Sequence, residues 1–275
     1  MLSLITGRVC MLSENKIEKL QTYLKNLNNA AVAFSAGVDS SFLLKIAKNI
    51  PGLKVIAITA ASSLLPEKEL NDAIDFCKQE KIKHIIFDFD CFGTHGFKVN
   101  PINRCYLCKK ELFKQIKELA AANNIENVLD GSNADDDNDY RPGLKALTEL
   151  AIKSPLKYAG LNKEEIRFMA EKMNIKSWNK PSFACLASRI AYGEEITREK
   201  LHMIESAELF LSGLSFSQLR VRVHRDIARI EVPEEQLDKL LNNREAVVSE
   251  LKKIGFKYVT MDLSGYRTGS MNEIL

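Results

Sequence analysis

The sequence lacks an apolar stretch that approaches the length of a membrane span, and its first apolar run, MLSLITGR, is too short for a signal peptide. It also lacks a strong excess of charge, because 39 basic residues stand against 36 acidic ones. Charge alone therefore gives no indication of nucleic-acid binding. Its six cysteines are spread along the chain, unlike those of a small secreted protein. We expect a cytoplasmic protein with reduced thiols and no membrane or nucleic-acid partner.

Short apolar segments alternate with segments of helical periodicity over roughly the first two thirds of the chain. Strands are expected at 31–34, 53–59, 84–89, 127–131 and 150–156. Helices are expected at 13–27, at 41–49, from Pro66 onward, at 106–123, and from a capping box at Asn162 and Glu165 to Met173. This alternation predicts an α/β fold with a parallel sheet covered on both faces, in which ligands bind beyond the carboxyl ends of the strands.

The pattern changes near residue 197. The rest of the chain predicts a smaller α+β unit, with a helix at 198–212, paired strands at 219–223 and 228–232, a long helix at 234–254 and a strand at 258–263. We therefore expect two domains, at 1–197 and 198–275, with the second serving substrate binding or oligomerisation.

The segment AVAF-SAGVDS-SFLLKIA places a loop of small residues between a strand and a helix. Consecutive backbone N–H groups there, together with the helix N-terminus, form a cradle for an anion. Ser35 and Ser40 can add hydroxyl donors, and Gly37 lets the backbone approach a phosphate. Asp39 is itself an anion, so ordering the loop or holding Mg²⁺ would explain it. An ordinary turn with serine caps is the alternative, but the complete strand–loop–helix context favours a nucleotide site.

The loop has no Gly-Lys-Ser/Thr ending, so it is not a Walker loop. It resembles the pyrophosphate loop, Ser-Gly-Gly-x-Asp-Ser, of the ATP-pyrophosphatase (PP-loop) superfamily, whose members cleave ATP to AMP and pyrophosphate. Ala36 stands where glycine is usual, and its methyl group could restrict the loop. The resemblance implies an adenine nucleotide alpha hydrolase-like domain with an ATP site at Ser35, Ala36, Gly37, Val38, Asp39, Ser40, Ala60 and Ser132.

Further segments narrow the choice within this superfamily. They are LDGSNADDDNDYRPG at 129–143, KPSFACLASRIAYGEEIT at 180–197, MDLSGYRTGSMNE at 261–273 and NRCYLCKKELF at 103–113. Together with the loop they resemble the LarE family of ATP-dependent sulfur transferases, which build the nickel-pincer cofactor of lactate racemase. The resemblance covers about residues 14–273, and its specific parts are the CLASR and DGSNADD blocks.

The LarE resemblance implies a definite reaction. A carboxylate of pyridinium-3,5-biscarboxylic acid mononucleotide is adenylated with ATP and Mg²⁺, and a cysteine thiolate then displaces AMP. In the sacrificial version of the reaction, the cysteine loses its own sulfur to the product and remains as dehydroalanine. The resemblance also implies a homo-oligomer.

The cysteine that matches this role is Cys185, in ACLASR. Thiolates form where cations are near, and Arg189 lies four residues on, so the two could share a helical face. On composition alone, a buried and inert cysteine beside a surface arginine is the more common case. The CLASR match reverses that judgement and makes Cys185 the candidate nucleophile.

The other cysteines leave two questions. Some LarE-like proteins hold an iron–sulfur cluster through extra cysteines near this site, but here no cysteine follows Cys185, and a cluster needs several thiolates. We therefore favour the sacrificial route. Cys105 and Cys108 form a single C-x-x-C, which is a weak zinc signal because a structural site wants four ligands. Redox chemistry and simple packing both remain open for this pair.

Arginines of the second domain suit a phosphate. Arg220 and Arg222 alternate on one predicted strand and so point to the same face, and Glu231 could face them from the paired strand. With Arg189 they are the expected ligands of the substrate phosphate. An exposed polar face balanced by Glu231 is the open alternative.

An acidic run, Asp135–Asp137 and Asp139, follows a predicted strand end. Such a run is usually a solvated loop, but in an ATP enzyme Mg²⁺ binding is a fair rival. The carboxylates that we expect at the metal are Asp39, Asp135 and Glu231.

Three other functions compete with sulfur transfer. An ammonia-using amide synthetase of the NAD synthetase type would need no thiol at position 185. A tRNA-thiolating enzyme would predict a strongly basic face, which a net charge of +3 does not support. A non-enzymatic nucleotide-binding regulator would show no exchange of pyrophosphate into ATP.

Overall fold

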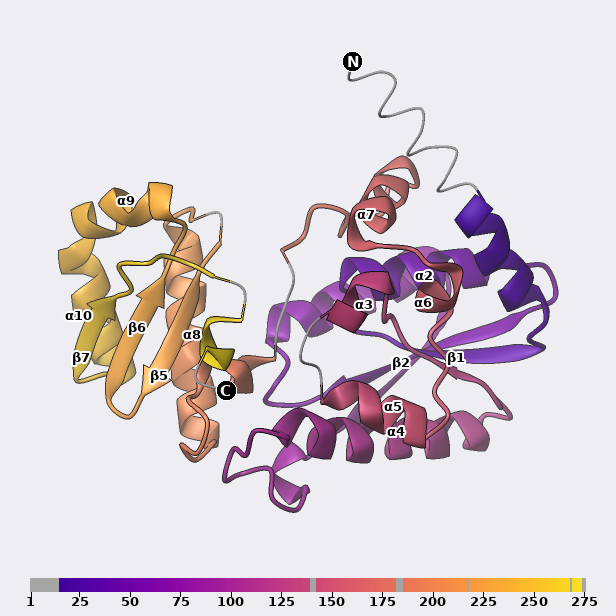
Figure 1. The fold of residues 1–275 in the computed structure, drawn as a ribbon, viewed down its shortest axis with the longest axis horizontal. Coiled ribbons are helices and arrows are strands. Elements are labelled where there is room, and N and C mark those ends of the chain that lie inside the picture. The colour runs from indigo at the N-terminus through magenta and orange to yellow at the C-terminus, as the bar shows by residue number, and fades with distance from the viewer. Residues whose placement is uncertain (1–14, 139–141, 182–184, 217, 268, 274–275) are drawn as a thin grey trace. The chain divides into compact units, whose positions relative to one another are not determined.

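The structure is a computed structural model that describes residues 15–138, 142–181, 185–216, 218–267 and 269–273 (Figure 1). The chain forms two compact units. The first unit comprises residues 1–62, 67–89 and 105–182, and the second comprises residues 63–66, 90–104 and 183–275. The chain therefore passes between the units more than once. The two units are defined only by which residues pack together. The assignment of domains to 1–197 and 198–275 stays a prediction.

The first unit contains a four-stranded parallel sheet in the order β3-β2-β1-β4. Its strands are β1 (Asn29–Ala33), β2 (Lys54–Ala61), β3 (Lys83–Asp88) and β4 (Val128–Leu129). Its helices are residues 15–25, α2 (Val38–Lys48), α3 (Glu67–Glu80), α4 (Arg104–Ala122), α5 (Gly143–Glu149), α6 (Pro155–Ala159) and α7 (Lys163–Lys172). The α/β fold with a parallel sheet is confirmed.

Helices cover both faces of this sheet, with α2 and α3 on one side and α4 and α5 on the other (Figure 1). Alternate side chains of β1 pack on opposite faces of the sheet, because successive side chains of a strand point in opposite directions. Ala30 and Val32 join the cluster that contains Phe42 of α2, whereas Ala31 joins the cluster that contains Phe113 of α4.

The expected strand at 150–156 is wrong. Lys153 makes one isolated parallel bridge to Leu129, and the chain then enters α6 at Pro155. Proline has no N–H to give to a strand ladder and suits the first turn of a helix. Ala151, at φ 54°, lies in the left-handed region, which also interrupts extended backbone.

The second unit contains a three-stranded sheet in the order β5-β6-β7, formed by β5 (Arg220–His224), β6 (Ile227–Glu231) and β7 (Tyr258–Met261). As predicted, β5 and β6 pair with each other, in antiparallel direction, and β7 then joins β6 in parallel. The helix α8 (Arg198–Gly213) packs on β5 and on α10 (Arg244–Ile254). This smaller unit is the expected α+β element.

The single long helix expected at 234–254 is also wrong. The segment forms a short 3-10 turn at Glu234–Gln236, then α9 (Leu237–Asn242), then α10. Asn243 ends α9 and precedes α10, and its φ of −99° and ψ of 10° are not helical. Asparagine favours such breaks because its side chain can bond to local backbone. In the described part of the chain, no helix combines the length and apolar character needed to cross a membrane.

Candidate functional site

The predicted nucleotide loop connects β1 to α2. The helix begins at Val38, three residues earlier than expected, so that Asp39 and Ser40 lie in its first turn. The Ser35 backbone N–H donates to Ser40 Oγ at 3.4 Å, and Ser40 Oγ donates to the Gly37 carbonyl at 3.2 Å. These bonds close the loop into a compact turn at a helix N-terminus, which is the geometry that an anion cradle requires.

Ala36 adopts a backbone conformation that is unusual for a residue other than glycine. Its φ is 55°, in the left-handed region that glycine enters without steric cost. An alanine there stays buried against the core of the first unit, at 3% exposure. Ala36 therefore carries the backbone strain that a glycine would avoid at this position.

The loop is tied to the neighbouring strand. The Phe34 N–H donates to the Ile58 carbonyl at 2.9 Å, and Thr59 Oγ1 donates to the Phe34 carbonyl at 2.8 Å. Ala60 follows on β2 and lies half-buried, paired in the ladder with Phe87. The loop and Ala60 thus lie at the carboxyl ends of adjacent parallel strands, where ligands bind in such sheets.

The segment after β4 packs against the loop, so that the two motifs of the first unit meet. A Cβ on Gly131 would lie 3.1 Å from the Ser40 backbone nitrogen and 3.5 Å from Asp39 Cβ. Asn133 Nδ2 donates to Asp39 Oδ1 at 3.3 Å. Ser132 is buried, and its N–H donates to Asp130 Oδ2 at 3.2 Å.

We expect Gly131→Ala to disturb the nucleotide loop specifically. The added methyl group would press on the backbone of the first turn of α2, and overpacking of this kind costs about 1–3 kcal/mol. Denaturant unfolding should show that loss, and the affinity for ATP should fall as well. Gly160→Ala is the control for the loss of a glycine, because no atom lies within 4 Å of its added Cβ and its φ of 75° carries only backbone strain. Equal ATP affinity in both variants would contradict the prediction.

Two carboxylates of the predicted metal site, Asp39 and Asp135, both bond to Lys163 in the first unit. Asp39 Oδ2 forms an ion pair with Lys163 Nζ, and Asp135 Oδ2 accepts the Lys163 backbone N–H at 2.8 Å. Lys163 was not singled out from the sequence, although a lysine as the first residue of a helix is a usable signal. Among the described residues, no group of three or more His, Cys, Asp or Glu side chains could hold a metal ion. The Mg²⁺ assignment therefore stays a prediction, as does the ATP site. Asp139, in the acidic run, lies outside the described residues.

Cys185 lies in the second unit, immediately before a 3-10 turn at Leu186–Arg189, and is exposed. The Arg189 guanidinium is buried at 1% exposure and makes two parallel bonds of 3.0 Å to the Glu208 carboxylate. Its Nη1 also donates to the Cys185 carbonyl at 3.2 Å and to Ser188 Oγ at 3.1 Å. Arg189 thus bonds the backbone that carries Cys185, on a 3-10 turn and not on an α-helical face. Its expected roles beside the thiolate and as a ligand of the substrate phosphate stay predictions.

The predicted pairing of Arg222 with Glu231 is confirmed, and both side chains are buried. Arg222 Nη2 donates to Glu231 Oε2 at 2.8 Å and to Ser270 Oγ at 3.1 Å, and its Nη1 donates to the Ser188 carbonyl at 3.2 Å. Glu231 is fully buried and also accepts from Arg229 at 2.9 Å. Its role as a metal ligand stays a prediction.

Arg220, at the start of β5, is also buried. Its guanidinium lies 5.4 Å from the centre of the Tyr266 ring, and its Nη1 donates to the Leu219 carbonyl at 2.7 Å. Burial, and then the positive charge of Arg189, lower the pKa of Arg220. The negative charge of Glu208 acts in the opposite direction and raises the pKa of Arg220. Tyr266 and Ser270 both belong to the segment at 261–273, so this motif meets the CLASR turn and β5 in the second unit.

The remaining described cysteines divide by burial. Burial raises the pKa of Cys77 to about 12 and also raises the pKa of Cys91, so both are inert thiols at neutral pH. Cys105 and Cys108 lie in the first turns of α4, one exposed and one half-buried. Their role stays open.

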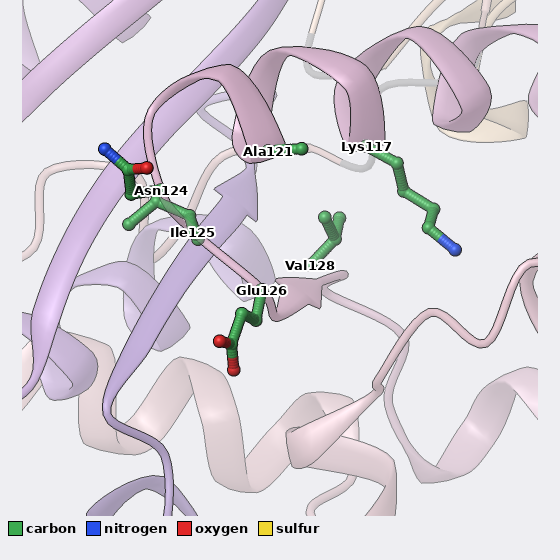
Figure 2. Close-up of a pocket in the computed structure, with 6 residues that line it drawn as sticks. All are labelled: Lys117, Ala121, Asn124, Ile125, Glu126 and Val128. Atoms are coloured by element: carbon green, nitrogen blue, oxygen red, sulfur yellow. The ribbon is translucent and has the colours of Figure 1, made fainter.

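A cavity of about 500 Å³ lies away from these motifs, at the end of α4 and the start of β4 (Figure 2). Its lining residues are Lys117, Ala121, Asn124, Ile125, Glu126 and Val128. Figure 2 shows the side chains of Lys117 and Glu126 extending in different directions. None of the predicted site residues lines this cavity, and we assign no chemistry to it.

Comparison with known proteins gives three relatives along nearly the whole chain. No protein-family model matches. The chain is 40% identical over 265 residues to an uncharacterised protein of Synechocystis, covering 95% of this chain and 98% of that one. An uncharacterised protein of Methanocaldococcus jannaschii is 32% identical over 92% of this chain and 98% of its own. The pyridinium-3,5-bisthiocarboxylic acid mononucleotide synthase of Lactiplantibacillus plantarum is 36% identical over 253 residues, which cover 92% of each chain. The chain therefore belongs to the LarE family, the family of this synthase.

Proposed function

We propose that this chain is an ATP-dependent sulfur transferase that converts a carboxylate of pyridinium-3,5-biscarboxylic acid mononucleotide into a thiocarboxylate, with Cys185 as the sulfur donor. The observation that carries the proposal is the CLASR turn. It presents an exposed cysteine on a backbone fixed by a buried arginine. The Lactiplantibacillus relative is a pyridinium-3,5-bisthiocarboxylic acid mononucleotide synthase, which supports the proposed product.

The first proposed step is adenylation, in the first unit. A carboxylate oxygen is a poor leaving group, whereas AMP is a good one, so ATP activates the acid with release of pyrophosphate. The backbone N–H groups of the loop at 35–38 and the hydroxyls of Ser35 and Ser40 would hold the phosphates. Asp39 and Asp135 offer carboxylate oxygens, the ligands that Mg²⁺ prefers, and a bound Mg²⁺ would neutralise phosphate charge.

The second proposed step transfers sulfur. The Cys185 thiolate attacks the acyl carbon, AMP leaves with the bonding electrons of its oxygen, and a thioester forms. A base then takes the Cys185 Cα proton, and the electron pair of that C–H bond forms the Cα=Cβ double bond as the Cβ–S bond breaks. The thiocarboxylate departs with the sulfur, and dehydroalanine remains in the chain. Arg189 acts in this scheme by holding the turn, since its guanidinium is engaged by Glu208 and the Cys185 carbonyl.

The arginines of β5 should separate into a binding role and a structural role. Arg220→Ala should raise the substrate dissociation constant about 10- to 150-fold, the loss of one charge-assisted contact, and leave the dissociation constant of ATP unchanged. Arg222→Ala should instead lower the free energy of unfolding by about 1.5–3 kcal/mol, because it removes one charged partner of the fully buried Glu231, which keeps its bond from Arg229.

Calorimetric titration of substrate and ATP, with thermal unfolding of each variant, measures this separation. Arg244→Ala is the control, because Arg244 is exposed on α10 of the same unit. Equal losses for ATP and substrate in Arg220→Ala would contradict the assignment.

The proposed function is tested by incubating the protein with the pyridinium mononucleotide, ATP and Mg²⁺. Mass spectrometry should detect the thiocarboxylate together with equal amounts of AMP and pyrophosphate. Formation of an amide only when ammonia is supplied would place the chain with the NAD synthetase-like enzymes instead. Absence of ATP–pyrophosphate exchange would indicate a nucleotide-binding regulator.

A further inference from the structure

Arg104 is a buried arginine of the second unit, and it belongs to the segment NRCYLCKKELF. Its exposure is 4%. Within the part of the chain that the structure describes, no Asp or Glu side chain forms an ion pair with it. The buried arginines Arg189 and Arg222 of the same unit, by contrast, pair with Glu208 and Glu231. A buried charge is costly unless it is paired, so the surroundings of Arg104 favour a bound anion.

The position of Arg104 in its helix adds to this preference. It is the first residue of α4, at the end where the helix dipole is positive and a cation is disfavoured. The structure describes the whole first turn of α4, and that turn contains no acidic residue to offset the charge. An anion held by Arg104 would therefore also lie at the favourable end of the helix dipole.

Neutral groups hold the Arg104 guanidinium on one edge and one face. Its Nη1 donates to Asn100 Oδ1 and to the Ile190 carbonyl, the latter at 3.4 Å. The centre of the Tyr192 ring lies 4.6 Å from its Cζ. These contacts fix the orientation of the guanidinium but supply no negative charge.

The other edge of the guanidinium consists of Nε and Nη2. As far as the structure describes the chain, neither atom has a hydrogen-bond partner. This edge presents parallel N–H groups that match the two oxygens of one carboxylate. Arg189 uses the same two atoms in this way, at 3.0 Å each, on the Glu208 carboxylate. The open edge of Arg104 is therefore suited to a carboxylate.

Arg104 lies where the turn that carries Cys185 ends. Its acceptor Ile190 directly follows this turn and also forms a parallel bridge with Val223 of β5, the strand that begins with Arg220. All of these residues belong to the second unit. A ligand group on Arg104 would thus be bound beside the residues to which we assign sulfur transfer and the substrate phosphate.

We propose that Arg104 is a substrate-binding residue whose Nε and Nη2 hold the carboxylate that ATP does not activate. The inference rests on the proposed function, in which the substrate carries two carboxylates on one ring and only one of them is adenylated at a time. The other stays ionised and needs a cation. Arg104 then makes the enzyme selective for a dicarboxylate, because a site built to bond a polar group rejects an analogue that lacks it.

The test compares two substrates in ATP–pyrophosphate exchange. One is pyridinium-3,5-biscarboxylic acid mononucleotide, and the other is its analogue with a neutral carboxamide in place of one carboxylate. The analogue has the same shape and still offers one carboxylate for adenylation. The wild type should therefore show a lower KM for the dicarboxylate than for the carboxamide analogue.

Arg104→Met should raise the KM of the dicarboxylate about 10- to 150-fold, the loss of one charge-assisted contact, and leave that of the analogue unchanged. Arg104→Lys keeps the charge without the two parallel donors and should recover part of the loss. Arg198→Met is the matched control and should behave as the wild type. Arg198 also stacks on a ring, 4.7 Å from the centre of Phe92, but it is exposed and pairs with Asp90 at 2.9 Å.

Equal losses for both substrates in Arg104→Met would overturn the inference, because Arg104 would then only support the backbone at Ile190. Equal KM values for the two substrates in the wild type would also overturn it, and this comparison needs no variant that folds. Absence of exchange in the wild type with the dicarboxylate would instead refute the proposed function.

Discussion

Cys185→Ala is expected to abolish formation of the thiocarboxylate while the protein still exchanges pyrophosphate into ATP in the presence of substrate. The physical reason is that alanine carries no sulfur, whereas the nucleotide loop belongs to the first unit and keeps its bonds. Cys185→Ser should behave in the same way, because a hydroxyl could form an ester but could not give up sulfur. We expect the loss of product to reach the detection limit of mass spectrometry.

Cys105→Ala is the control for this experiment, because Cys105 is also an exposed cysteine. It should retain a single turnover of sulfur transfer. Full activity in Cys185→Ala would move the chain to another branch of the superfamily. Loss of transfer in Cys105→Ala would contradict the claim that Cys185 alone supplies the sulfur.

Asp39→Asn is expected to reduce ATP–pyrophosphate exchange at least about 100-fold, the effect of losing one strong electrostatic contact in the transition state. The amide cannot replace a carboxylate as a ligand for Mg²⁺, and it no longer balances Lys163. The fold should persist, because Asp39 is partly exposed and asparagine can still accept the bond from Asn133.

Asp72→Asn provides the comparison, since Asp72 also pairs with a lysine of the first unit, at 2.6 Å, but lies on α3. Exchange should remain at the wild-type rate in this variant. Normal exchange in Asp39→Asn would remove Asp39 from the reaction.

The sequence predicted the sheet because its signals are local. An apolar run such as 53–59 and a capping box at Asn162 and Glu165 each depend on a few adjacent residues, and both appear in the structure. The failures at 150–156 and 234–254 come from residues that interrupt a correct hydrophobic pattern. Pro155 starts a short helix, and Asn243 divides a longer one. Hydrophobic periodicity alone does not show whether a proline or an asparagine within the pattern will interrupt the strand or helix.

Only those site residues that belong to a recognisable sequence motif could be predicted. The loop, Cys185 and the arginines of β5 were proposed from the sequence, and the structure shows the hydrogen-bond partners of several of them. Glu208 and Lys163 were missed because each acts on a residue far along the chain, Arg189 and Asp39 respectively. The need for glycine at 131 was equally hidden, since it arises from a close approach to the Ser40 backbone.

The central claim is that Cys185 loses its own sulfur, and intact-protein mass before and after turnover tests it most directly. Reaction with the pyridinium substrate, ATP and Mg²⁺ should lower the protein mass by that of H₂S, with one product formed per active site. Peptide mapping should place the change in ACLASR. Many turnovers with Cys185 unmodified would contradict the account and would require an external source of sulfide.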